Sequence, residues 1–388
     1  MSLSSRGEAF RERASVAGVR CLERTAEGRV IERVGRPRVG AGTDLAEVAK
    51  GADAVIVALP AFTHERYLRA LLPLVSTSAV IVLMPAYGCG DLLVRRLLSE
   101  RGDSTVSRRV VLMEQLPWVC RVVDFGSCVD LRAHKREVRY LEVRAGADDD
   151  AEGPCAREVV DLIASAYRGR LVEMTCGGHR GALALTISNP NAMMHAALLY
   201  GHARRGAGSR GAGSSPPSFY HDATDEGLGL LVGLDDEVMA LRGTLVTQAR
   251  ELEAPLASIR PFRDWIRDAY RGQIADPSTV ATCMRTNAAF AGLLAPAQRG
   301  PSDACVIDID HRYLTEDVVH GLLPLKGVSA LVNANTPVLD RLLTWGQELL
   351  GARWIHAGRL SPSAHASPYR TPQRFGVGDL RELLALPR

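Results

Sequence analysis

Three short, strongly apolar runs, each separated from the next by a helical pattern, constrain the fold of this chain more than any other feature. The runs are AVIVALP at 54–60, AVIVLM at 79–84 and RVVLM at 109–113. The segments between them, THERYLRALLPLV and GDLLVRRLLSE, carry leucines at helical spacing. Strands that alternate with helices are joined by right-handed crossovers into a parallel sheet. We therefore predict a doubly wound, Rossmann-like α/β sheet, in which 54–60 is a fully buried strand.

The rest of the chain predicts a sheet domain at 1–180 and a mainly α-helical domain at 181–388. Asn189-Pro190 provides an N-cap followed by proline at the first helical position, and the helix that it opens is apolar almost all round, which predicts burial. We also expect a helix at 7–18, a polar hairpin at 19–34, a strand pair at 128–143, a helix at 151–167, a strand at 171–175, a flexible loop at 206–218, and helices at 223–250, 262–272, 277–292, 315–331, 336–350 and 377–386.

Composition excludes several classes of protein. A formal charge of +3 over 388 residues provides no concentrated basic face for nucleic acid. The 8 cysteines are scattered without a CxxC motif, which is typical of reduced thiols in a cytoplasmic protein. The first twenty residues lack the apolar core of a signal peptide, and no run reaches the ~18 apolar residues of a membrane helix. We expect a cytoplasmic protein that binds small molecules, without nucleic acid, membrane or obligate protein partner.

Ligands of open α/β sheets bind at the carboxyl ends of the strands. Two segments follow such ends: Pro60-Ala61-Phe62 and Pro85-Ala86-Tyr87-Gly88-Cys89-Gly90. Gly88 and Gly90 permit a ligand to approach the backbone closely, although a simple tight turn into the next helix explains them equally well. No GxGxxG precedes 54–60, and the GAG at 40–42 lacks the third glycine of a dinucleotide-binding turn.

Two ionisable side chains are candidates for proton transfer. His195 lies in the apolar helix after Asn189, where a lone histidine is more often a satisfied core residue, and its second ring nitrogen needs a partner. Asp317 is a candidate for that partner. We expect Thr315 to cap the next helix, with Glu316 and Asp317 in its first turn, but this leaves Arg312 unexplained. A His–Asp pair with a nearby arginine is what reversible carbonyl or imine reduction requires.

From about residue 42 to its end, the chain resembles the opine dehydrogenases, most closely the octopine dehydrogenase type. The order and spacing of several blocks carry this resemblance: ADAVIVALPAFTHERYLRAL, EQLPWVCRVVDFG (114–126), NPNAMMH (189–195), FYHDATDEGLGLLVGLDDE (219–237), DAYRGQIADPSTVATCMRTNAAFAGLLAP (268–296), HRYLTEDVVHGLLPLKGV and NTPVLDRLLTWGQELLG.

The resemblance implies a nucleotide-binding domain plus a helical substrate domain. The implied activity is NADH-dependent reductive condensation of an α-keto acid, typically pyruvate, with an amino acid. By resemblance, His195 is the catalytic acid/base, Asp317 its orienting partner, Arg312 a contact for a substrate carboxylate and Trp265 a pocket wall. Further expected site residues belong to two groups, the cleft lining and the NAD-binding strand ends. They are Gln115, Trp118, Cys120 and Arg121 for the lining, for which loop packing is an equally good explanation, and Pro60, Ala61, Pro85, Gly88 and Gly90 for NAD.

Members of this family open with a strand and a glycine-rich turn, and we expect this chain to begin after them. The sequence is then either incomplete or a natural variant that binds NADH poorly; the intact catalytic motifs favour the first explanation. Two other functions remain open. One is a related keto-acid reductase that needs no amine, and the other is a catalytically impaired remnant that acts as a binding protein.

Overall fold

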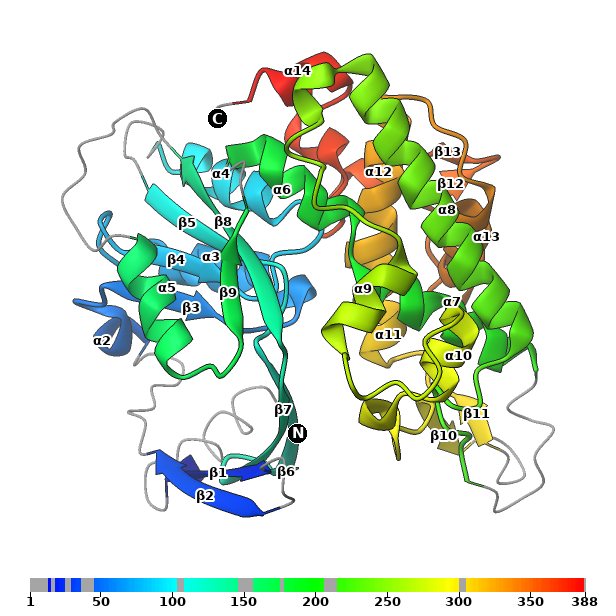
Figure 1. The fold of residues 1–388 in the computed structure, drawn as a ribbon. Helices are drawn as coiled ribbons and strands as arrows, with labels where there is room; N and C mark the ends of the chain where they lie inside the picture. The colour runs from blue at the N-terminus through cyan, green and yellow to red at the C-terminus, as the bar shows by residue number, and fades with distance from the viewer. Residues whose placement is uncertain are drawn as a thin grey trace. The chain divides into compact units, whose positions relative to one another are not determined.

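The computed structural model describes residues 13–14, 18–24, 29–35, 45–102, 108–145, 156–174, 178–205, 215–299 and 305–386. The chain divides into two compact units, shown as ribbons in Figure 1. Unit 1 comprises 1–59, 63–85 and 97–173, and unit 2 comprises 60–62, 86–96 and 174–388. The domain boundary near residue 180 stays a prediction, and the predicted helix at 7–18 and the loop at 206–218 fall largely outside the described residues.

Unit 1 contains a five-stranded sheet of order β3-β4-β5-β8-β9. Its strands are β3 (Ala54–Val57), β4 (Val80–Leu83), β5 (Arg108–Met113), β8 (Glu137–Ala145) and β9 (Arg170–Glu173). The first three are parallel, as predicted, and β8 is antiparallel to β5. The prediction of a fully buried strand at 54–60 is wrong, because β3 pairs only with β4 among the described strands and Ile56 is 44% exposed.

Helices cover the apolar sheet of unit 1. Two of the described helices, α2 (Leu45–Ala49) and α5 (Ala156–Ser165), lie wholly in this unit, and α3 (Ala61–Leu71) belongs to it from Thr63 onward. Figure 1 shows α5 in front of the sheet, where Val159, Val160 and Ile163 pack against Val111 and Met113. This burial of branched side chains removes apolar surface from water and supplies the core of the unit. The predicted α/β class, a Rossmann-like sheet followed by a helical part, is confirmed.

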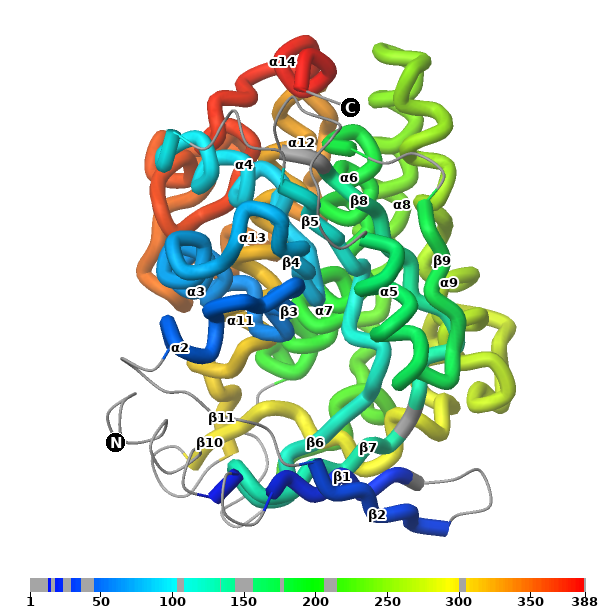
Figure 2. The backbone as a smooth tube through the Cα atoms, turned by 90° about the vertical axis from the view of Figure 1, so that its left-hand side faces the viewer, coloured from blue at the N-terminus to red at the C-terminus, as the bar shows by residue number. Residues whose placement is uncertain are grey.

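A second, four-stranded sheet in unit 1 was only partly predicted. Its order is β2-β1-β7-β6, from β1 (Val19–Arg24), β2 (Val30–Gly35), β6 (Trp118–Asp124) and β7 (Cys128–His134). The polar hairpin β1/β2 is confirmed. The expected pairing within 128–143 is wrong, since β7 and β8 belong to different sheets and the chain passes between them at residues 135–136 (Figure 2). The loop predicted around Trp118 is strand β6, because it pairs along β7.

Unit 2 is mainly helical, with two small hairpins that the helical pattern did not predict. Its helices are α6 (Gly178–Ile187), α7 (Pro190–Arg204), α8 (Asp225–Gln248), α9 (Phe262–Ala269), α10 (Val280–Arg285), α11 (Arg312–Thr315), α12 (Leu323–Leu331), α13 (Pro337–Leu349) and α14 (Leu380–Leu384); α4 (Gly90–Glu100) begins here. The hairpins are β10 (Ala297–Arg299) with β11 (Cys305–Ile307), and β12 (Ile355–His356) with β13 (Arg359–Leu360).

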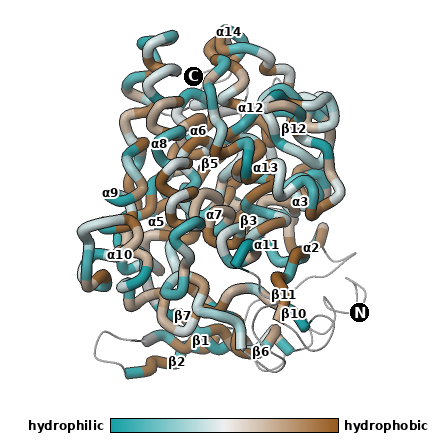
Figure 3. Tube along the Cα trace, turned by 90° about the vertical axis from the view of Figure 1, so that its right-hand side faces the viewer, coloured by the Kyte–Doolittle hydropathy of each residue, from teal (hydrophilic) through white to brown (hydrophobic). Residues whose placement is uncertain are grey.

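Helix α7 forms the centre of unit 2. Its predicted start is confirmed, because the side chain of Asn189 accepts a hydrogen bond from the amide of Ala192 and Pro190 occupies the first turn. Nearly every residue from Pro190 to His202 is buried, as predicted. Helices α8, α11 and α13 pack on α7. Figure 3 shows hydrophobic segments within both units, consistent with a separate core in each.

The expected single helix at 315–331 is three elements. Helix α11 ends at Thr315, a π-helical turn, η7 (Val318–Leu322), follows, and α12 begins at Leu323. Pro324 explains the interruption, since it has no amide hydrogen to donate to the carbonyl of His320 four residues earlier. The prediction that Thr315 caps the helix is wrong: His311 is the N-cap of α11, and its ring nitrogen accepts from the amide of Tyr313.

None of the described helices combines the length and the apolar character that a bilayer span requires.

Candidate active site

The structure places His195 and Asp317 in contact. Nδ1 of His195 lies 2.7 Å from Oδ2 of Asp317, and both side chains are buried, with 5% of each residue exposed. Because a carboxylate only accepts hydrogen bonds, Nδ1 carries the hydrogen and Nε2 is the nitrogen that exchanges a proton. A buried imidazole oriented in this way is a competent general acid or base.

The close packing of η7 on α7 makes this contact possible. His195 lies in α7 and Asp317 immediately precedes η7. Gly321 faces α7 so closely that a Cβ atom at this position would overlap the side chain of Ala192. A glycine is therefore required here for the two elements to approach each other, and their approach brings residues 122 positions apart in the sequence into one site.

Aromatic side chains hold the imidazole on its remaining sides. The ring of Tyr313 stacks on that of His195 at a centroid distance of 3.8 Å. The hydroxyl of Tyr220 lies 3.0 Å from Nε2 of His195. Neither tyrosine was among the predicted site residues, although both stand in the quoted blocks FYHDATDEG and HRYLTED. That a particular hydroxyl reaches a particular nitrogen depends on tertiary packing, which the one-dimensional pattern does not contain.

Arg312 lies on α11, next to Tyr313, and its side chain is 53% exposed. Its Nε is 3.4 Å from Oε2 of Glu316, which leaves most of the guanidinium accessible to a ligand.

Glu316 was expected to complement its own helix dipole, but its Oε1 instead accepts from the backbone amide of Ala61 at 2.8 Å. Burial raises the pKa of Glu316, the Asp317 carboxyl raises it further, and Arg312 opposes both effects.

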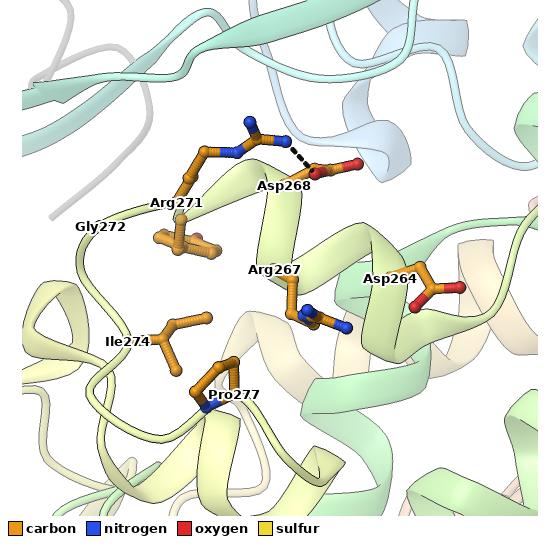
Figure 4. A pocket seen from close by; sticks show the side chains of 8 residues that line it. Asp264, Arg267, Asp268, Arg271, Gly272, Ile274 and Pro277 are labelled. Atoms are coloured by element: carbon orange, nitrogen blue, oxygen red, sulfur yellow. Dashed lines mark hydrogen bonds and ion pairs between the residues drawn. The ribbon is translucent and has the colours of Figure 1, made fainter.

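Trp265 lies on α9, where it is 8% exposed and packs on Phe262 and Tyr270. A cavity of about 390 Å³ adjoins this helix. Figure 4 shows its walls, which combine two acidic and two basic side chains with Tyr270 and apolar groups. The lining residues are Asp264, Arg267, Asp268, Tyr270, Arg271, Gly272, Ile274 and Pro277. Neither Trp265 nor a member of the His195–Asp317 pair is among them, so this cavity is a feature distinct from the proton-transfer site.

Two predicted substrate contacts lie in unit 1. Gln115 is buried, and its Oε1 accepts from Nζ of Lys135 at 2.7 Å, while Cys120 is exposed on β6. Burial lowers the pKa of Lys135 to about 8. Trp118 packs edge-on against Tyr167, which favours its alternative interpretation as a packing residue. The substrate-binding roles of Gln115 and Cys120 stay predictions.

Comparison with known proteins identifies the family. A family model described as "NAD/NADP octopine/nopaline dehydrogenase, alpha-helical domain" matches residues 179–350. Tauropine dehydrogenase of Arabella iricolor is 30% identical over 336 residues, which cover 87% of this chain and 80% of that protein. Octopine dehydrogenase of Mizuhopecten yessoensis is 28% identical over 358 residues, 92% of this chain and 84% of that protein. The chain belongs to the opine dehydrogenase family.

The fold agrees with that of a solved opine dehydrogenase. The structure of octopine dehydrogenase with NADH and L-arginine superposes with a TM-score of 0.80, covering 98% of this chain and 89% of that one, at 24% sequence identity. The family is one of NAD-dependent oxidoreductases, as the resemblance implied.

The predicted NAD-binding residues provide a test of fit for the cofactor. The amide of Ala61, at the start of α3, is already bonded to Glu316, and its carbonyl accepts from Arg370. Gly88 has φ +59°, and a Cβ there would overlap the carbonyl oxygen of His320. These two positions therefore do not form a cradle for a pyrophosphate, and the tight-turn interpretation fits Gly88 better. For Pro60, Ala61, Pro85, Gly88 and Gly90, NAD binding through other groups of the cofactor stays a prediction.

Proposed function

We propose that this chain catalyses the NADH-dependent reductive condensation of an α-keto acid, pyruvate, with the amino group of an amino acid, and the reverse oxidation. The observation that carries the proposal is the buried His195–Asp317 pair, at 2.7 Å, in the helical unit that the family model matches. Membership of the opine dehydrogenase family supports it independently.

Each of the three site residues has a distinct task. His195 exchanges the proton that condensation and its reversal require, and Asp317 fixes its tautomer and stabilises the imidazolium. The exposed guanidinium of Arg312, beside Tyr313 on α11, binds a substrate carboxylate with its planar fork of donors. NADH, when bound, supplies the hydride that reduces the carbon–nitrogen double bond.

The substrates of related proteins indicate which keto acid and which amine should be assayed first. Solved structures of octopine dehydrogenase are described with pyruvate and with L-arginine, and another relative is a tauropine dehydrogenase. The first substrates to assay are therefore pyruvate with arginine and pyruvate with taurine. As the compartment we propose the cytoplasm, because the eight scattered cysteines follow no disulfide framework.

The test is NADH oxidation by the full chain with pyruvate alone and with pyruvate plus arginine, alanine or taurine. We expect turnover only when an amine is present, with a secondary amine dicarboxylate, or its sulfonate equivalent from taurine, as the product detected by mass spectrometry. A rate that is independent of any amine would instead identify a keto-acid reductase. Absence of both turnover and NADH binding would identify a non-catalytic binding protein.

A further inference from the structure

The nitrogen of His195 that must exchange a proton with substrate is already occupied. Asp317 holds Nδ1 at 2.7 Å, so Nε2 is the nitrogen left for chemistry, and the Tyr220 hydroxyl lies 3.0 Å from it. In the neutral tautomer the hydroxyl donates to Nε2, and in the imidazolium it accepts from Nε2–H. A hydroxyl has one hydrogen and two lone pairs, so it serves both protonation states without moving.

Neither ring is free to turn away from the other. Tyr220 is 4% exposed, and its ring is stacked on Phe290 at 4.1 Å and set edge-on against Phe219 at 4.8 Å. The imidazole is fixed by Asp317 and by the ring of Tyr313 at 3.8 Å. Displacing the hydroxyl from Nε2 therefore requires at least one of these aromatic contacts to break, since interiors are close-packed.

We infer that Tyr220 is the residue through which His195 exchanges its proton with the substrate. This inference rests on the proposed function and adds Tyr220 to the proposed site residues His195, Asp317 and Arg312. Tyr220 and His195, oriented by Asp317, form a proton relay in which the tyrosine hydroxyl is the outer member.

The relay balances in the condensation direction. The amine adds to the keto carbon to give a carbinolamine, whose hydroxyl must leave as water. The Tyr220 O–H proton passes to that oxygen while the Nε2 proton of the imidazolium passes to the Tyr220 oxygen. The carbon–oxygen bond breaks, water departs, the carbon–nitrogen double bond forms, and His195 becomes neutral. Two transfers deliver one net proton from the imidazolium to the substrate, whose positive charge then resides on the iminium, and the reverse reaction returns that proton.

The kinetic test compares Tyr220→Phe, His195→Ala and the double variant in the full chain, with Tyr200→Phe as the matched control. Tyr200 is also a buried tyrosine, but it lies on α7 and its hydroxyl binds Arg341 rather than His195. We expect Tyr220→Phe to lower kcat by about 10²-fold or more, as removal of a proton-transfer group does. The double variant should be no slower than the slower single variant, because members of one relay act as a unit. Tyr200→Phe should retain wild-type kcat.

Two results would overturn the relay. In the first, Tyr220→Phe keeps wild-type kcat with an unchanged or lower KM, which means that substrate displaces the hydroxyl from Nε2. In the second, the losses of the two single variants multiply in the double variant, which means that the residues act separately.

A spectroscopic measurement separates failure of the relay from failure of the proposed function. In the ¹⁵N-histidine-labelled full chain, with the His195 signals assigned from His195→Ala, the Nε2 resonance should shift in Tyr220→Phe and not in Tyr200→Phe. An unchanged resonance in Tyr220→Phe refutes the hydrogen bond whether or not the wild-type protein turns over. Wild-type protein with the expected shift but no amine-dependent turnover refutes the proposed function, and the catalytic relay with it, while the bond itself stands.

Discussion

Replacement of Asp317 by asparagine isolates the electrostatic part of the proposed site. The amide oxygen can still accept the Nδ1 hydrogen of His195, so the 2.7 Å contact can persist, but the negative charge is lost. Two unit charges about 4 Å apart attract each other by about 4 kcal/mol at the effective dielectric constant of a protein, near 20. Since each ~1.4 kcal/mol of transition-state stabilisation is a factor of ten in rate, we expect Asp317→Asn to lower kcat by about 10²- to 10³-fold.

The assay is the initial rate of amine-dependent NADH oxidation at saturating substrates, together with the circular dichroism spectrum of the variant. Asp91→Asn is the matched control, because Asp91 forms a second buried pair, with Nδ1 of His179, at the same 2.7 Å. We expect the control to lose stability but to keep kcat. The reasoning is refuted if Asp317→Asn stays within about threefold of wild type, or if both variants lose the same activity.

Three further predictions concern stability. Burial raises the pKa of Asp235 to about 6, so its ionisation opposes folding above that pH, and the penalty vanishes as the pH falls below its ordinary 3.8. In urea unfolding, Asp235→Asn should therefore gain about 1 kcal/mol at pH 8, after allowance for solvent screening, and lose the part of the pH dependence between 4 and 6 that Asp235 contributes. Gly88→Ala should lower the free energy of unfolding by more than about 2 kcal/mol, because a Cβ at φ +59° overlaps the His320 carbonyl. Gly351 has a similar φ of +62° but open space around it, so Gly351→Ala should lower the free energy of unfolding by only about 1 kcal/mol. Equal losses in the two variants would contradict the packing argument. The Glu237 carboxylate accepts hydrogen bonds from the backbone amides of Val338 and Leu339 at the start of α13, at 2.6 and 3.0 Å. Glu237→Ala should therefore destabilise the chain by about 2–4 kcal/mol. A thermal-unfolding midpoint equal to that of wild type would contradict this role.

Elements with a strong local signal could be predicted from the sequence. The parallel strands β3, β4 and β5 have dense β-branched runs, and α7 has both a capping residue, Asn189, and an apolar surface all round. Strand β6 was missed because its charged residues, Arg121 and Asp124, interrupt the apolar alternation, and only pairing with β7 makes it a strand. Tertiary partners override local pattern in such segments.

In the candidate site, too, residues with a local sequence signal could be predicted and residues placed by tertiary contacts could not. A helix starting at Thr315 gives no structural role to Arg312, and this is what pointed to Arg312 and Asp317 as site residues. The N-cap of α11 is in fact His311, which is not among the usual capping residues and was therefore not predicted. Glu316 was assigned to its own helix dipole, whereas its carboxylate bonds the amide of Ala61, 255 residues away. The hydroxyl of Tyr220 likewise belongs to the site only through packing of the loop before α8. Long-range contacts of this kind leave no periodicity to read.

The most direct test of the account measures product formation and NADH affinity for the wild-type chain and His195→Ala in parallel. The full chain is incubated with NADH, pyruvate and the best amine, the opine is quantified by mass spectrometry, and NADH affinity is measured by fluorescence titration. The account predicts amine-dependent product for the wild type, loss of product by about 10²-fold or more for the variant, and NADH dissociation constants within about twofold of each other. Opine formation by His195→Ala at the wild-type rate would contradict it.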